Sequence, residues 1–179
     1  MLVVNLFAGP GVGKSAYAAG LFHALKTRTS LNVELVQEYA KELVWRGDTK
    51  VLKHNQALVF AGQLEKILML DDNVSVAITD SPLDLGLFYH SEDYPESFDK
   101  FVLDICARFN TIDFFIPRKD EYWFTQEGRI HSLNESKELD QRILGYLKAR
   151  EKPFHVVQRD DVETGLKLVV NRVIKDHTK

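Results

Sequence analysis

A glycine-rich segment near the N-terminus has the composition and spacing of a loop that binds phosphate. The run Ala8-Gly9-Pro10-Gly11-Val12-Gly13-Lys14-Ser15 follows the apolar stretch Leu2–Phe7 and precedes a helical pattern. Glycines let backbone N–H groups curl around phosphate oxygens, and the first turn of the helix adds its dipole. Lys14 would contact the β- and γ-phosphates, and the Ser15 hydroxyl would bind Mg²⁺. The segment therefore predicts a nucleoside triphosphate site.

We expect the main chain of this loop to hold the nucleotide, with help from one later arginine. Ala8 stands where the strict pattern has its first glycine, which an extended conformation at that residue would tolerate. The alternative is an ordinary glycine-rich turn in which Lys14 and Ser15 occur by chance, and the strand and helix around the loop argue against it. ATP with Mg²⁺ is the expected cofactor, bound by Gly9, Gly11, Val12, Gly13, Lys14, Ser15, Ala16 and Arg118.

Two carboxylates come directly after predicted strands, where the loops of a parallel sheet gather. Asp80 follows the strand pattern 74–79, and we assign it with Ser15 to Mg²⁺. The same residue could cap the next helix, because Asp-Ser-Pro is a good helix start. Glu38 ends the strand predicted over 31–37 and would accept the proton of an acceptor hydroxyl, or it is an exposed residue that favours a helix N-terminus. The predicted catalytic residues are Lys14, Glu38, Asp80 and Arg129.

A long polar segment after the fourth predicted strand is a candidate lid. Pro117 stops that strand, and a loop containing Tyr122-Trp123-Phe124 continues to Glu138. Loops of this length in compact domains are functional or disordered, and the aromatic residues argue against disorder. Cations of this lid, approximately 118–138, and of the helix behind it would neutralise charge on a transferred phosphoryl group; the alternative is a solvated charged loop. These cations are Arg118, Lys119, Arg129 and Arg142.

The acceptor is expected on the side of the site that carries Glu38. An aromatic base or pyridine ring needs flat surfaces on which to stack, and aromatic residues occur close to the end of the second predicted strand. Most aromatic residues at helical spacing belong to a core, so a packing role competes with this assignment. The residues expected to bind the acceptor are Glu38, Tyr39, Lys41, Trp45 and Asp84.

The elements around these residues alternate between short apolar runs and helical patterns, which predicts a parallel sheet covered by helices on both faces. Strands are expected at 2–7, 31–37, 74–79, 111–116 and 154–158. Helices are expected at 13–27, 39–45, 54–70, 98–109, 139–147 and 162–174. With right-handed crossovers, these elements form a three-layer α/β/α sandwich of the P-loop NTPase type, with a five-stranded parallel sheet and a lid. Ligands of such sheets bind beyond the carboxyl ends of the strands.

Length and composition limit the classes of protein that fit. A chain of 179 residues with 45% hydrophobic residues predicts one domain, over 1–179, with a full core. The net charge of -3 gives no overall attraction to nucleic acid or membrane. The single cysteine, Cys106, excludes an internal disulfide, and the scattered histidines predict no protein-built zinc site. We find no charged leader and no membrane-length apolar run, so we expect a cytoplasmic protein. The oligomeric state stays open.

Three classes of phosphate-loop protein compete for this sequence. A GTP-dependent switch needs Asn-Lys-x-Asp to recognise guanine, and the sequence contains no such tetrapeptide. An ATPase that activates water typically has glutamate after the aspartate that ends the third strand, whereas Ser81 follows Asp80. A small-molecule kinase needs an acceptor pocket, a carboxylate near the acceptor hydroxyl and a closing lid. All three features are predicted here, which favours a phosphotransferase that uses ATP.

The sequence resembles the NadR-like group of P-loop kinases and ATPases, which includes the nicotinamide riboside kinase domain. Lys41 stands where the group usually has arginine, which weakens a bidentate contact at that position. The resemblance implies an ATP-dependent phosphotransferase that acts on a hydroxyl of a nucleoside, nucleotide or nucleotide-like compound. It rests on Gly13-Lys14-Ser15, Glu38-Tyr39-Ala40-Lys41, Gln56, Gln63, Asp80-Ser81-Pro82 and Pro117 to Glu127-Gly128-Arg129.

Two other functions stay open at the level of sequence. Related compact kinases occur in bacteriophage genomes, where some phosphorylate a modified base, such as a hydroxymethyl pyrimidine, within DNA. Such an enzyme needs a positive groove, for which Lys41 and the basic segment 46–54 are the candidates, although that segment also fits a solvated connection. A regulatory ATP-binding or ATPase module would bind nucleotide without transfer to an acceptor. The expected partners are therefore a nucleotide donor and a small-molecule or DNA-base acceptor, with no membrane.

Overall fold

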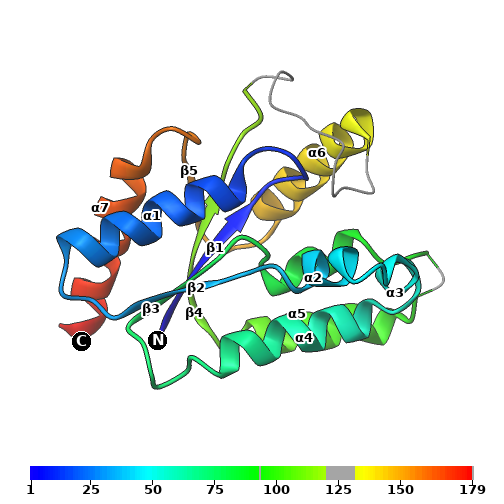
Figure 1. Cartoon of the computed structure of the whole chain (residues 1–179), viewed down its shortest axis with the longest axis horizontal. Helices are drawn as coiled ribbons and strands as arrows, with labels where there is room; N and C mark the ends of the chain where they lie inside the picture. The colour runs from blue at the N-terminus through cyan, green and yellow to red at the C-terminus, as the bar shows by residue number, and fades with distance from the viewer. Residues whose placement is uncertain (93, 120–131, 179) are drawn as a thin grey trace.

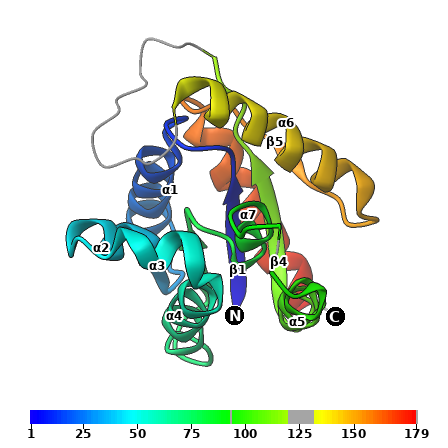
Figure 2. The ribbon, with the colours of Figure 1, turned by 90° about the vertical axis from the view of Figure 1, so that its right-hand side faces the viewer.

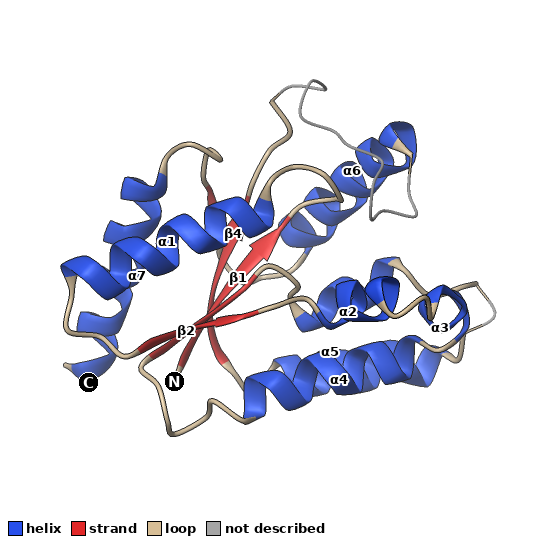
Figure 3. Cartoon of the chain, viewed as in Figure 1, coloured by secondary structure: helices blue, strands red, loops and turns tan. Residues whose placement is uncertain are grey.

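A computed structural model describes residues 1–92, 94–119 and 132–178 of the chain (Figure 1). Within these residues, parallel strands form one five-stranded sheet in the order β2-β3-β1-β4-β5. The central strand β1 has β3 and β4 as its neighbours, and the helices lie on both sides of the sheet (Figure 3). This arrangement confirms the predicted three-layer α/β fold. The strands are β1 (Leu2–Phe7), β2 (Val33–Val36), β3 (Val76–Thr79), β4 (Asn110–Phe115) and β5 (His155–Val156).

The helices divide between the two faces of the sheet. Helices α1 and α7 cover one face, whereas α4, α5 and α6 cover the other. In the view of Figure 2, the pair α2 and α3 lies on one side of β1 and α6 lies on the other; Figure 1 gives the view at right angles. The helices are α1 (Lys14–Arg28), α2 (Tyr39–Trp45), α3 (Thr49–His54), α4 (Gln56–Leu68), the 3-10 helix η1 (Leu83–Phe88), α5 (Glu96–Cys106), α6 (Leu133–Ala149) and α7 (Val162–His177).

The apolar residues of β1 explain why both faces of the sheet are covered. Leu2, Val4 and Leu6 are buried against α1 and α7. Val3 and Phe7 are buried under the helices of the opposite face. Side chains of a strand point alternately to the two faces, so a strand that is apolar on both requires helices on both. The end of β1 is thereby held at the centre of the molecule, where the glycine-rich loop begins.

The edge strands are shorter than the sequence predicts. We expected strands at 31–37 and 154–158, whereas β2 covers Val33–Val36 and β5 covers His155–Val156. β5 pairs with β4 through Phe114↔His155 and Phe115↔Val156. An edge strand has a partner on one side alone, so its hydrogen-bonded length depends on one neighbour. The five-stranded parallel sheet itself is as predicted.

The connections differ more from the prediction than the strands do. Segment 46–54, expected as a loop, contains α3, and the segment after β3 contains η1. The last helix before β5 begins at Leu133, so residues 133–138 are helical where we expected polar loop. A capping box explains this early start, because Ser132 accepts from the Glu135 N–H and the Glu135 carboxylate accepts from the Ser132 N–H. Among the described residues, no helix combines the length and apolar composition needed to cross a bilayer.

Candidate active site

The glycine-rich loop follows β1 directly and ends in the first turn of α1. Gly11 and Gly13 have φ angles of 79° and 103°, values that glycine adopts without strain. The Tyr17 N–H donates to the Gly13 carbonyl at 3.0 Å, so the helix begins within the motif. Val12 is buried, and Ala16 is exposed in the first turn. The loop therefore has the strand, turn and helix context that a phosphate site needs.

Lys14 extends along the loop and is hydrogen-bonded within it. Its ammonium group donates to the carbonyl oxygens of Ala8 at 2.7 Å and Gly9 at 3.2 Å. Burial lowers the pKa of Lys14 below its ordinary value of 10.5, because desolvation disfavours the charged form. The carboxylates whose charge opposes this shift are Glu38, Asp80 and Asp140. The structure thus brings two of the predicted catalytic carboxylates close to Lys14.

The two residues assigned to the metal contact each other. The Ser15 hydroxyl donates to Oδ2 of Asp80. Asp80 is 8% exposed at the end of β3, and its Oδ1 has no hydrogen-bond partner within the described ranges 1–92, 94–119 and 132–178. A buried carboxylate oxygen without a donor is costly unless a cation or water satisfies it. The hydroxyl and carboxylate therefore fit Mg²⁺, a hard cation that prefers oxygen ligands.

The remaining ligands of such an ion would come from outside the protein. In the part of the chain that the structure describes, no group of three or more histidine, cysteine, aspartate or glutamate side chains could hold a metal. Mg²⁺ is commonly bound by one or two protein groups together with substrate phosphates and water. Ser15 and Asp80 alone match this pattern, so metal binding is expected to depend on the nucleotide.

Glu38 precedes α2 at the carboxyl end of β2. Its side chain is half-buried and makes no capping hydrogen bond, which argues against the role of an exposed helix start. The next N–H, that of Tyr39, donates to Oε1 of Gln63 at 2.8 Å, and Nε2 of Gln63 donates to Oγ1 of Thr79 at 3.1 Å. Gln63 is buried on α4. It therefore links the start of α2 to the end of β3, where Asp80 follows.

The other predicted acceptor residues do not gather around Glu38. The Tyr39 ring packs against α4, where a Cβ added at Gly62 would lie 2.5 Å from the ring. Lys41 is exposed, and Trp45, at the end of α2, is 73% exposed. Tyr39 and Lys41 are two positions apart on α2 and therefore face different directions. A role of Tyr39, Lys41 and Trp45 at the acceptor stays a prediction.

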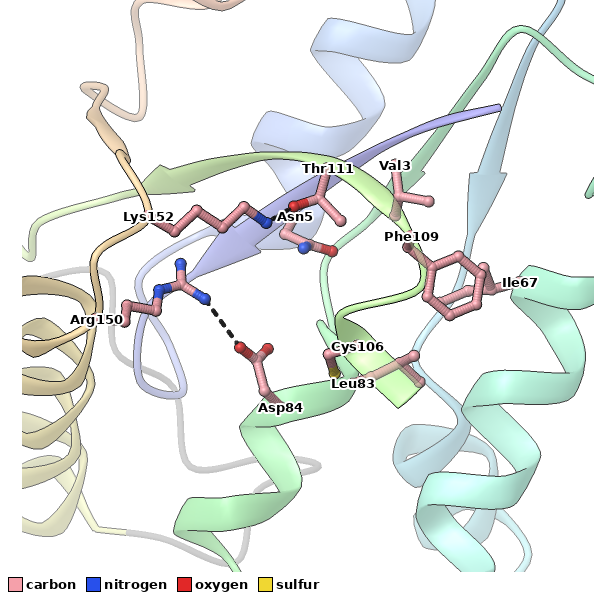
Figure 4. A pocket seen from close by; sticks show the side chains of 10 residues that line it. All are labelled: Val3, Asn5, Ile67, Leu83, Asp84, Cys106, Phe109, Thr111, Arg150 and Lys152. Carbon is pink, nitrogen blue, oxygen red and sulfur yellow. Dashed lines mark hydrogen bonds and ion pairs between the residues drawn. The ribbon is translucent and has the colours of Figure 1, made fainter. Parts of the chain in front are cut away.

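Asp84 lies in a separate polar group on the α6 side of the sheet (Figure 4). Arg150 donates from Nη1 to Asp84 at 3.1 Å and from Nη2 to Asp113 at 2.6 Å, and the Tyr146 hydroxyl donates to Asp84 at 2.8 Å. Burial raises the pKa of Asp84 in spite of these partners. Asp84, Arg150 and Lys152 line a cavity of about 30 Å³, which has room for about one water molecule. Asp84 therefore serves an internal ion-pair network in this structure.

Arg118 lies beside the loop and is bonded to protein groups. Its Nε donates to Oδ2 of Asp140 at 2.7 Å, and its Nη2 donates to the Pro10 carbonyl at 2.8 Å. The Gly9 N–H donates to Oδ1 of Asp140 at 2.7 Å. Gly9, which we expected to bind the cofactor, thus directs its N–H to a carboxylate of the protein. A contact of Arg118 with phosphate stays a prediction.

A cavity of about 160 Å³ adjoins the loop. One wall is formed by Arg159, over which the loop packs closely, because a Cβ added at Gly13 would lie 2.5 Å from Cδ of Arg159. The cavity joins the loop to Arg159 and Asp160, which follow β5 in the chain. Its lining residues are Gly11, Val12, Pro117, Arg118, Lys119, Arg159 and Asp160.

Some predictions concern residues that the structure leaves undescribed. Arg129 and most of the predicted lid, 120–131, lie outside the described residues. Arg142 of α6 is described, and its guanidinium lies 5.7 Å from the centre of the Phe88 ring. Lys119 pairs with Asp160 at 3.3 Å across the cavity beside the loop.

Sequence reasoning missed Asp140 and Asp113, although each had a signal. Asp113 interrupts the apolar run 111–116, and a charged residue inside a buried strand needs partners. Asp140 lies on the buried stripe of α6 that runs from Ser136 through Ile143 to Leu147. The spacing of this stripe is helical, and it extends the helix before residue 139, where we expected it to begin.

With the geometry in place, comparison with known proteins defines the family. The model of a family described as an AAA domain matches residues 3–164. The chain belongs to this AAA domain family. The match covers the glycine-rich loop, the carboxylates at the strand ends and the first turn of α7. No curated protein matches the AAA domain described here.

Two solved structures of deoxyadenosine kinase from M. mycoides have a similar fold. The structure with the products dCMP and a flexible dCDP bound has a TM-score of 0.60 and 17% identity, and the alignment covers 97% of this AAA domain chain and 98% of that chain. The structure with bound dATP has a TM-score of 0.60 and 18% identity, with 96% and 98% covered. At these identities the likeness shows a shared fold.

These comparisons support the broader part of the resemblance drawn from the sequence. The AAA domain has a P-loop fold that is similar to the fold of a deoxynucleoside kinase. They give no support to the narrower assignments, the nicotinamide riboside kinase domain and the bacteriophage kinases. The acceptor is therefore a question for chemistry and experiment.

Proposed function

We propose that the chain is a kinase that transfers the γ-phosphoryl group of MgATP to a hydroxyl of a nucleoside, nucleotide or nucleotide-like acceptor. One observation supports this most directly: Glu38, Asp80 and Lys14 come from three separate strand ends and lie close enough to interact electrostatically. An ammonium group for phosphate, a carboxylate for metal and a second carboxylate for an acceptor are the parts that such a transfer requires.

Each part has a defined task in the proposed reaction. The amides from Gly11 to Ser15 and the Lys14 ammonium would hold the phosphates in line with the acceptor. Magnesium, held by Ser15 and Asp80, would neutralise charge on the phosphate oxygens. The acceptor oxygen forms a bond to the γ-phosphorus as the bond to the β-phosphate oxygen breaks, and Glu38 receives the hydroxyl proton. ADP leaves with the electron pair of the broken bond.

The donor base is assigned to the cavity beside the loop. Arg159 and Asp160 come from the segment after β5, and the cavity joins them to Gly11 and Val12. A purine attached to phosphates on this loop needs a space that adjoins the loop directly, and this cavity of about 160 Å³ does so. Arg118, Ala16 and Arg129 keep their predicted roles at the phosphates as part of this proposal.

An acceptor panel with γ-labelled ATP tests the proposed activity. Wild-type protein would be incubated with nucleosides, mononucleotides, plain DNA and DNA that contains a hydroxymethyl pyrimidine. We expect label in a free nucleoside or mononucleotide, with deoxynucleosides foremost because the structural relative is a deoxyadenosine kinase. Label in modified DNA alone would indicate a DNA-base kinase. Tight ATP binding without any transfer would indicate a regulatory module, and either result would refute the proposal.

The DNA-base alternative has less support in the structure than in the sequence. Arg46 belongs to the basic segment 46–54, and its guanidinium pairs with Glu42 at 3.7 Å. Lys66 of α4 also pairs with Glu42. A cluster that is partly neutralised by a neighbouring carboxylate attracts a DNA backbone less strongly.

Replacement of Glu38 by glutamine should lower kcat by about 10²-fold or more, because an amide cannot accept the acceptor proton. The dissociation constant for MgATP should change less than about twofold, since Glu38 contacts the acceptor and not the donor in the proposed reaction. Steady-state kinetics and calorimetry measure the two quantities. Glu34→Gln is the matched control, because Glu34 lies on β2, the strand that precedes Glu38, and pairs at the surface with Lys26. An unchanged kcat in Glu38→Gln would remove the catalytic role.

MgATP binding should take up protons at alkaline pH. Burial lowers the pKa of Lys14, so in the free protein the group begins to lose its proton below 10.5. A triphosphate beside the ammonium favours the charged form and raises this pKa, so affinity should fall as pH rises through the lowered pKa of the free protein. Calorimetry in two buffers of different ionisation enthalpy measures the uptake. Equal binding enthalpies in both buffers at alkaline pH would contradict it.

A further inference from the structure

Asp140 of α6 contacts the glycine-rich loop at two points. Its Oδ1 accepts from the Gly9 N–H at 2.7 Å, a contact between residues 131 positions apart in the chain. Its Oδ2 accepts from Nε of Arg118 at 2.7 Å, and Nη2 of Arg118 donates to the Pro10 carbonyl at 2.8 Å. Two consecutive residues of the loop are therefore tied to one carboxylate, Gly9 directly and Pro10 through Arg118.

The contact is built into the packing of α6 on the loop. A Cβ added at Gly9 would lie 2.6 Å from the Ser136 carbonyl oxygen and 2.7 Å from Oδ1 of Asp140. Ser136 and Asp140 stand one helical turn apart on the buried stripe of α6. Only glycine at position 9 lets the backbone of the loop approach the helix this closely. At Gly9 the loop therefore packs directly on helix α6, which is a rigid element.

The charge of Asp140 is unfavourable for the function that we propose. A carboxylate beside a phosphate site repels the ligand, and the repulsion is strong where water is excluded. The side chains of Asp140 and Arg118 are each 9% exposed, so the pair is largely desolvated. Such a pair is weak evidence for stability, because desolvation offsets its attraction. A role in maintaining the shape of the loop accounts for the position of the Asp140–Arg118 pair.

We propose that Asp140 is a positioning residue of the phosphate loop. It fixes Gly9 and, through Arg118, Pro10, so that the amides from Gly11 onward keep the curvature that phosphate oxygens require. The inference rests on the proposed function, since it assumes that the loop binds MgATP. Because the Gly9 N–H is bonded to Asp140, this amide serves the shape of the loop, and the later amides serve the ligand.

Variants at position 140 separate the two contacts. Asp140→Ala removes both, and kcat/KM for ATP should fall by about 10²-fold, the loss expected when reacting groups are misplaced by about 1 Å. Asp140→Asn keeps an oxygen for the Gly9 N–H and loses the charge that pairs with Arg118, so it should recover a substantial part of that loss. Gly9→Ala should reproduce the effect of Asp140→Ala, because its Cβ would meet Ser136 and Asp140.

Calorimetric titration with MgATP distinguishes a positioning role from a purely structural one. A structural role would lower the fraction of binding-competent protein and leave the dissociation constant of that fraction unchanged. A positioning role raises the dissociation constant at unchanged stoichiometry. Glu138→Gln is the control, since Glu138 is an exposed carboxylate on the same helix. If Asp140→Ala does not fold, Asp140→Asn and Gly9→Ala supply the same comparison.

The outcomes for the two proposals are separate. Absence of MgATP binding by the wild type would refute the proposed function. Wild-type binding together with an unchanged dissociation constant and kcat/KM in Asp140→Ala, or in the variants that replace it, would refute the positioning role alone. A raised dissociation constant with partial recovery in Asp140→Asn supports it.

Discussion

Lys14→Ala should lower the rate of phosphoryl transfer by about 10³-fold, the upper range for removal of one preorganised charge stabiliser from an active site. The ammonium group lies on the loop and is bonded to the carbonyls of Ala8 and Gly9. In the proposed reaction it neutralises charge that develops on the phosphates, and alanine has no group that replaces it. We therefore expect kcat to fall and the dissociation constant for MgATP to rise together. Single-turnover assays and calorimetry measure both.

The same substitution should leave the stability of the protein unchanged or slightly higher. Burial lowers the pKa of Lys14, which means that the fold disfavours its charged form relative to the unfolded chain. Lys26→Ala is the control for loss of a lysine on α1, because Lys26 lies in the last turn and pairs at the surface with Glu34. Equal activity of Lys14→Ala and Lys26→Ala would overturn the assignment of the loop.

Arg150→Met should destabilise the protein by about 3 kcal/mol, the lower end of the cost of removing one partner from a buried ion pair, because Lys152 still pairs with Asp113 at 3.2 Å. The guanidinium pairs with Asp84 and with Asp113, which is fully buried in β4. Its planar group also lies 5.2 Å from the Phe7 ring centre and 5.1 Å from that of Tyr146. Methionine preserves most of the packing of the aliphatic part of the Arg150 side chain, so the loss of stability measures the contribution of the charge. Urea unfolding monitored by circular dichroism measures it.

The loss of stability caused by Arg150→Met should become smaller as pH falls. Burial raises the pKa of Asp84 in the folded protein, and removal of Arg150 takes away an interaction that opposes this shift. The folded variant would then bind a proton at a higher pH than the unfolded chain does, so acid relieves part of the penalty. Arg46→Met is the control, because Arg46 is an exposed residue whose pairing with Glu42 contributes about 1 kcal/mol or less. A pH-independent difference between wild type and Arg150→Met would contradict this account.

The sequence predicted the five-stranded parallel sheet and the position of the loop because both depend on local pattern. Apolar runs of β1, β3 and β4 are bounded by turn residues, and helical spacing between them requires parallel strands. The motif Gly13-Lys14-Ser15 is contiguous, so its strand and helix context can be recognised without knowledge of distant contacts. Asp80 could be placed near Ser15 for the same reason, since neighbouring parallel strands end at one edge of the sheet.

The acceptor side was harder to predict because its geometry depends on contacts between distant segments. Tyr39 and Trp45 are aromatic in sequence, yet one packs on Gly62 and the other is exposed, because α2 is short and lies on α4. Asp84 follows Asp80 closely in the chain, but the helical turn of η1 directs it to Arg150. Residues close in sequence were thereby separated in space by the direction of short helices.

The amino-acid sequence by itself determined that this chain forms a parallel α/β sandwich with a phosphate loop after its first strand, since periodicity and a contiguous motif are local properties. The tertiary structure alone decided that Asp140 holds Gly9, that Gln63 joins the segment after Glu38 to Thr79, and that Arg150 joins Asp84 to Asp113. Each of these contacts joins residues from different elements. Their formation depends on how helices pack on the sheet, and no spacing within one segment encodes it.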